Sequence, residues 1–169
     1  MKPPRTRLLA IAILVPTLLP GCGRPRIDDE VLLDVCHLVS AAEAERILGD
    51  PAGAPVTLPD FGGFAGGCAW VFKEGDVNAR LTAYIMTKTS AEHGLTTPRR
   101  WFENRSRIGE MKVTLGEPTE VRRIGDVANL YGSTLEVRQG DVVLMLHVDH
   151  GGREKLEAFA RMLLSPRKH

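Results

Sequence analysis

The N-terminal segment constrains this chain more than any other feature, because it predicts that the domain folds only after export. Three basic side chains, Lys2, Arg5 and Arg7, precede an apolar run from Leu8 to Leu19. A basic start followed by a short apolar run is typical of a secretory signal peptide. The run is too short for a bilayer, which needs about 20 apolar residues. We therefore expect the folded domain to begin downstream and to form where disulfides are stable.

The apolar run ends in Leu19-Pro20-Gly21-Cys22. These residues resemble the lipobox of bacterial lipoproteins, with an aliphatic residue, a small residue and then the cysteine. The resemblance implies cleavage before Cys22, a diacylglyceryl group on its sulfur and acylation of the new amino group. Residues 1–21 are then the signal peptide, and residues 22–34 are a lipidated cysteine and tether. The alternative is an ordinary signal peptide whose cleavage site lies near a cysteine.

Lipidation at Cys22 would make the membrane a partner of the protein, because two or more acyl chains hold a protein stably on a bilayer. Gly23 follows the cysteine, at the position where aspartate retains many lipoproteins in an inner membrane. By resemblance to that sorting pattern, a cell with two membranes would place this protein in the outer membrane, facing the periplasm.

The composition of the mature chain argues against nucleic acid as its main partner. Removing residues 1–21 and their three basic side chains from the 169 residues leaves 148, with 19 basic and 21 acidic side chains. Such a chain has no global basic bias. Its length fits one domain with a real core. We expect that domain at 35–165, followed by a short tail at 166–169.

Cys36 and Cys68 remain as an even pair if Cys22 carries lipid. Exported thiols usually pair, so a structural disulfide is favoured over a redox or metal pair. On the chain-entropy model such a bridge would stabilise the domain by roughly 3–4 kcal/mol. The metal alternative rests on His37 beside Cys36, which alone does not make a zinc site.

Three helices are predicted from local signals. Ser40 and Glu43 form a capping box for a helix at 40–48, which Gly49 ends. Thr97-Pro98 opens a second helix, as an N-cap followed by proline at the first helical position. The apolar spacing of residues 152–164 predicts a final helix.

Two β-hairpins are predicted around Gly-Asp turns. Residues 68–72 and 77–86 flank the first turn, and residues 131–138 and 142–149 flank the second. The segments 72–77 and 137–142 match in residue type, 65 positions apart. The predicted fold is α+β: an antiparallel sheet with helices on one face, built as two tandem helix-plus-hairpin units and closed by a C-terminal helix. Chance reuse of Gly-Asp in turns is the alternative to a repeat. The glycine-rich residues 60–67 are interpreted as a turn before Cys68.

The ordered features from Cys36 onward resemble a set of uncharacterised bacterial envelope lipoproteins. Their pattern is a C-x-L-x-S-x-x-E-A start, here residues 36–49, then Cys68-Ala-Trp70, a Gly-Asp-x-Ala element at 125–128 and a basic-x-Gly-Asp hairpin at 138–141. The likeness covers about residues 36–164. It implies an α+β domain with a Cys36–Cys68 bridge and no known catalytic residues. We expect no cofactor.

Catalytic and metal chemistry have little support in the sequence. His147 and Asp149 share a strand face, while His150 points away, and two aligned ligands are too few for a catalytic zinc site. Ser106 and Ser133 lack the Gly-x-Ser-x-Gly context of a hydrolase nucleophile. We therefore expect neither a metal site nor an enzyme.

The second predicted helix carries the most distinctive surface. Its candidate interaction residues are Arg99, Arg100, Trp101, Arg105 and Arg107. Arginines and aromatics are frequent at interfaces, which suggests contact with an acidic partner or anionic headgroups. The alternative is an amphipathic helix whose aromatics pack inward and whose arginines are solvated.

The sequence therefore predicts a lipid-anchored envelope protein with a non-catalytic binding or assembly role toward an envelope protein partner. The first alternative is a carrier of a small apolar or lipidic ligand. A cavity lined by Leu81, Ile85, Leu144 and Leu146 would favour the carrier, whereas a filled core with an exposed aromatic patch would favour the binding role. The second alternative is a hydrolytic enzyme.

Overall fold

The computed structural model describes residues 35–50, 53–93, 96–107 and 117–165. The predictions for the signal peptide, Cys22 and the tether lie outside these ranges. Within them, none of the helices combines the length and the apolar character that crossing a bilayer requires.

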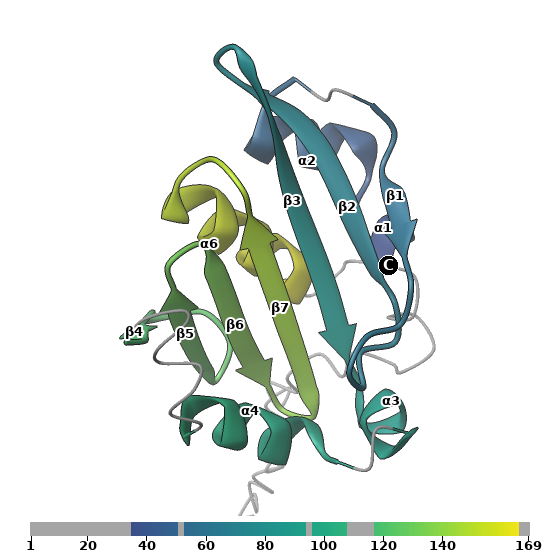
Figure 1. Cartoon of the computed structure of the whole chain (residues 1–169), viewed down its shortest axis with the longest axis vertical. Helices are drawn as coiled ribbons and strands as arrows, with labels where there is room; N and C mark the ends of the chain where they lie inside the picture. Colours follow the sequence, from purple (N-terminus) through teal and green to yellow (C-terminus); the bar gives the residue numbers. More distant parts are fainter. Residues whose placement is uncertain (1–34, 51–52, 94–95, 108–116, 166–169) are drawn as a thin grey trace, which may run out of the picture.

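The fold is α+β, as predicted, and its centre is a seven-stranded antiparallel sheet (Figure 1). The strands lie in the order β1-β2-β3-β7-β6-β5-β4. Their bounds are β1 Val56–Leu58, β2 Gly67–Glu74, β3 Val77–Met86, β4 Thr119–Glu120, β5 Val127–Tyr131, β6 Thr134–Gln139 and β7 Val142–Val148. The helices are α1 Val35–Leu38, α2 Ala41–Leu48, α3 Lys88–His93, α4 Pro98–Arg107 and α6 Arg153–Leu164.

The three predicted helices are confirmed. The Ser40 hydroxyl accepts from the Glu43 backbone N–H at 3.3 Å, and the Glu43 carboxylate accepts from the Ser40 N–H at 2.9 Å. This capping box satisfies backbone donors that the first turn of α2 leaves unpaired. Thr97 caps α4 by accepting from the Arg100 N–H at 3.2 Å.

One face of the sheet, called here the first face, carries the main core. The buried side chains of β2, β3 and β7 on this face pack against α1, α2 and α6, which lie behind the sheet in Figure 1. The Trp70 ring meets the Phe159 ring of α6 edge-on, with centroids 4.8 Å apart. Burial of this apolar surface is the main source of stability for the domain.

The prediction that the helices pack on one face is wrong for α4. Phe102 of α4 is buried against Met86 and Val143, which point to the opposite, second face. Residues of β3 and β7 near this end are apolar on both faces of the sheet, so both faces need cover. Alternating strand residues bring Tyr84 and Met145 to this same second face.

The hairpins follow the predicted repeat, whereas the helices do not. Both two-residue turns are Gly-Asp, at Gly75 and Gly140, and both glycines have positive φ. In the β3–β7 pairing, Thr82 lies opposite His147, its counterpart 65 residues later. This is the register of a twofold axis normal to the sheet between β3 and β7. A rotation about such an axis would place equivalent helices on the same face of the sheet. Instead, α2 covers the first face and α4 covers the second.

The predicted single strand at 131–138 is also wrong. A turn at Gly132-Ser133 divides it into β5 and β6, which pair with Tyr131 opposite Thr134. Gly132 has φ 55°, a left-handed conformation that glycine adopts at little cost. This turn adds a third hairpin and brings Tyr131 and Glu136 to the second face.

Candidate functional site

Helix α4 lies across one end of the second face, at the lower end of the sheet in Figure 1. Its register follows from the Thr97 cap and from Phe102, which is buried in the small core of this face. Arg105 lies three positions after Phe102 and four after Trp101, so the three side chains share the side of the helix that meets the sheet. The exposed side of α4 carries Arg99 and Arg100.

An aromatic cluster links the glycine-rich loop to α4. It consists of Phe61, Phe64, Tyr84 and Trp101. The buried Phe64 ring meets Trp101 edge-on at 4.9 Å between centroids and Tyr84 at 6.1 Å. Phe61 lies against Tyr84 at 6.0 Å and is 60% exposed. The cluster therefore presents an exposed ring, Phe61, packed against the half-buried Tyr84, which in turn contacts the buried Phe64.

Gly67 leaves room for the Tyr84 ring of the cluster. It pairs with Tyr84 across the β2–β3 ladder, and a Cβ at this position would lie 2.7 Å from the Tyr84 ring and from the Ala83 carbonyl oxygen. The Tyr84 ring therefore lies directly over the glycine. A glycine inside a strand often marks such a close approach.

Arg105 connects α4 to the sheet. Its Nε and Nη2 donate to Glu136 Oε1 at 2.9 and 2.6 Å, and its guanidinium lies 4.9 Å from the centroid of the Trp101 ring. Glu136 is only 1% exposed. Burial raises the pKa of Glu136, and the hydrogen bond and charge of Arg105 offset this only in part. Arg105 and Glu136 thus form a partly desolvated ion pair, and the Arg105 guanidinium also makes a cation–π contact with Trp101.

The five predicted interaction residues separate into two groups. Trp101 packs toward the sheet, as the amphipathic alternative expects, whereas Arg105, which that alternative leaves solvated, pairs with the buried Glu136. Arg99 is exposed and pairs with Glu103 at 2.8 Å, and Arg100 is exposed. The side chain of Arg107 lies outside the described residues.

The Cys36–Cys68 disulfide is present, which confirms the predicted pairing. The two Cα atoms are 5.1 Å apart, and the bridge joins α1 to β2. Cys68 is fully buried in the main core. The disulfide therefore fixes the start of the domain to the sheet.

His147 takes part in a short polar chain on the second face. Its Nδ1 lies 3.0 Å from Thr134 Oγ1, and its Nε2 lies 3.2 Å from Asp149 Oδ1. His150 is exposed in the turn after β7. Across the residues that the structure describes, His, Cys, Asp and Glu side chains form no group of three that could hold a metal ion.

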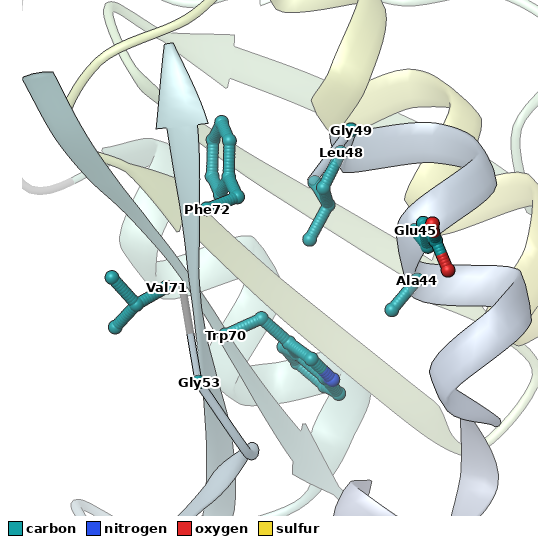
Figure 2. Close-up of a pocket in the computed structure, with 8 residues that line it drawn as sticks. All are labelled: Ala44, Glu45, Leu48, Gly49, Gly53, Trp70, Val71 and Phe72. Atoms are coloured by element: carbon teal, nitrogen blue, oxygen red, sulfur yellow. The ribbon is translucent and has the colours of Figure 1, made fainter. Parts of the chain in front are cut away.

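A shallow hollow lies between α2 and β2 (Figure 2). Trp70, Phe72 and Leu48 point into it, and Val71 points away. Its enclosed volume is about 10 Å³, close to the space that one water molecule needs, whereas pockets for drug-sized ligands have roughly 300–1,000 Å³. The four residues expected to line a carrier cavity instead belong to the main core, with exposures of 0–3%. They are Leu81, Ile85, Leu144 and Leu146.

Sequence reasoning missed Glu136, Tyr84 and Phe61. A signal existed for Glu136, because it stands between Leu135 and Val137 in a strand and so had to face the second side of the sheet. Phe61 lay in a segment interpreted only as a turn. Its contact with Tyr84 depends on the loop folding back, with a backbone bridge from Phe61 to Phe64, which no sequence spacing reveals.

Comparison with known proteins gives no relative: no family model, no curated protein and no solved structure matches this chain.

Proposed function

We propose that this protein is a lipid-anchored component of a bacterial cell envelope with a non-catalytic binding or assembly role. The anchor would be Cys22, as the lipobox resemblance implies. The partner would be another envelope protein, bound at the end of the domain that carries the aromatic cluster and α4.

The observation that carries the binding role is Phe61. A ring that is 60% exposed yet packed against Tyr84 is held ready for contact, and Arg100 is exposed on α4 at the same end. Aromatic and arginine side chains are enriched where proteins bind one another.

The packing of the core favours binding over the carrier alternative. The residues that would line a lipid cavity are buried among one another, and the hollow beside α2 is smaller than a ligand pocket of ordinary size. A bound lipid recovered with the purified protein would nevertheless favour the carrier.

Site-specific photo-crosslinking in the native cells tests the binding role. A crosslinker at Phe61 is compared with one at Val77, which is also exposed and apolar but lies at the hairpin, the opposite end of β3. We expect a discrete protein adduct from position 61 and at least tenfold less from position 77. Equal adducts from both positions, or none from position 61, would contradict the proposed surface.

Charge reversal at Arg100 tests the role of the helix. Arg100→Glu should weaken the adduct from position 61 if the partner is acidic, because Arg100 is exposed and its loss leaves the fold intact. Arg105 is unsuitable for this test, since it pairs with a buried carboxylate. An unchanged adduct would remove α4 from the proposed surface.

A further inference from the structure

Glu136 carries a buried oxygen that the described part of the chain leaves without a hydrogen-bond partner. Arg105 donates both of its hydrogen bonds to Oε1, and Oε2 receives none. The hydroxyl of Tyr131, which is 2% exposed, has no hydrogen bond of ordinary length among these residues, although the Asn129 side chain lies close enough to lower its pKa by hydrogen bonding. Buried polar atoms in folded proteins are nearly always hydrogen-bonded, so these two atoms in one cluster require an explanation.

The sheet register places these two residues together. Asn129 lies opposite Glu136, and Tyr131 lies opposite Thr134, so Tyr131 and Glu136 are diagonal neighbours on the second face. A carboxylate is only an acceptor, whereas a protonated carboxyl group is neutral and carries its own donor. An oxygen buried without a donor therefore favours the protonated form.

We propose that Glu136 is a proton-binding site of this domain: its buried carboxyl group takes up a solvent proton on Oε2 in mildly acidic medium while Arg105 stays hydrogen-bonded to Oε1. The bound proton removes the buried negative charge and keeps the hydrogen bonds that hold α4 on the sheet. Because Arg105 favours the ionised carboxylate, proton uptake relieves the burial cost of the charge but weakens the attraction between α4 and β6.

The charged and titratable neighbours agree with this assignment. The described groups of this kind on the second face near Glu136 are Arg105 of α4, Tyr131 of β5, His147 of β7 and, on β6, Arg138, whose partner is Asp126. Burial raises the pKa of Glu136 despite the opposing effect of Arg105. Burial and the charge of Glu136 raise the pKa of Tyr131, against the effects of Arg105 and Asn129, so the phenol stays neutral beside the carboxyl group.

The test is a carbon-13 NMR titration of glutamate carboxyl groups in the full-length chain, held in mild detergent. Glu136→Gln identifies the signal, and His147→Gln shows how far the titration of His147 contributes. We expect the Glu136 midpoint to lie above the ordinary glutamate value of 4.5 and to rise further in Arg105→Gln. A midpoint at or below 4.5 would overturn the proposal.

Tyr131→Phe separates the proposal from a competing arrangement. If the phenol donates a hydrogen bond to the carboxylate, its loss should raise the Glu136 midpoint. A raised midpoint would mean that the site stabilises the ionised form, which contradicts the proposal. An unchanged or lowered midpoint supports proton binding. Tyr84→Phe is the matched control, because Tyr84 lies on the same face but on β3.

Discussion

Arg105 and Glu136, 31 residues apart in the chain, form the ion pair that joins α4 to the second face of the sheet. Both donors of Arg105 converge on one carboxylate oxygen, and the guanidinium also lies over Trp101. The pair therefore positions the helix whose outer side and neighbouring aromatic cluster form the proposed binding surface.

Loss of Arg105 should destabilise the domain far more than loss of an exposed arginine. Arg105→Ala leaves the Glu136 carboxylate buried without its cation, which costs about 3–5 kcal/mol for a fully buried pair and less here because Arg105 is 23% exposed. Arg99→Ala breaks only an exposed i,i+4 pair with Glu103 and should leave the free energy of unfolding almost unchanged. Urea unfolding measures both. Equal costs would show that the Arg105–Glu136 pair contributes nothing beyond a surface contact.

The contribution of Glu136 to the free energy of unfolding should rise as the pH falls toward 4.5. Because the pKa of Glu136 is raised in the fold, the folded state binds more protons than the unfolded state between the two pKa values. The stability from Glu136 is thus fully present below 4.5 and is lost as the pH rises through the folded pKa. Glu136→Gln should flatten this part of the pH profile. A wild-type profile that already matches that of Glu136→Gln would contradict the assignment.

Removal of the disulfide should lower the stability by roughly 3–4 kcal/mol on the chain-entropy model. Cys36→Ala combined with Cys68→Ala tests this, because the bridge joins α1 to β2 and closes a loop with a sequence separation of 32. Reductant should destabilise the wild type and leave the double variant unchanged. A reductant effect of the same size on both would mean that the disulfide is not its target.

A side chain at position 67 should disturb the aromatic cluster. Gly67→Ala forces a Cβ against the Tyr84 ring and the Ala83 carbonyl, so we expect a loss of about 1–3 kcal/mol, typical of overpacking. Gly53→Ala is the matched control, since a Cβ there meets no atom within 4 Å. Thermal unfolding compares the two variants. Similar losses would show that the Tyr84 ring moves aside freely.

Elements with strong local signals were predictable from the sequence. The Ser40–Glu43 capping box, the Thr97-Pro98 start and the Gly-Asp turns each depend on residues close in the chain, and all three features are present. The Cys36–Cys68 bridge was predictable because two cysteines in a chain that is expected to be exported usually pair with each other.

The arrangement of α4 was not predictable in the same way. Its apolar stripe contains Trp101 and Phe102, but the stripe does not say which face of a sheet it will cover. The answer depends on Met86 and Val143 being brought side by side by the β3–β7 pairing, which joins distant parts of the chain. The face of the sheet on which Glu136 lies was predictable from the strand alternation. Its pairing with Arg105 was not, because that pairing depends on where α4 lies.

The most direct test of the proposed role is native mass spectrometry of the full-length protein, extracted from its own cells in mild detergent without reductant. We predict a chain that begins at Cys22, carries acyl groups, contains the Cys36–Cys68 bridge and retains one protein partner at fixed stoichiometry. That partner should be lost from Phe61→Asp and retained by Val77→Asp. An unmodified Cys22, or an acylated chain that carries only a bound lipid and no protein, would contradict the account.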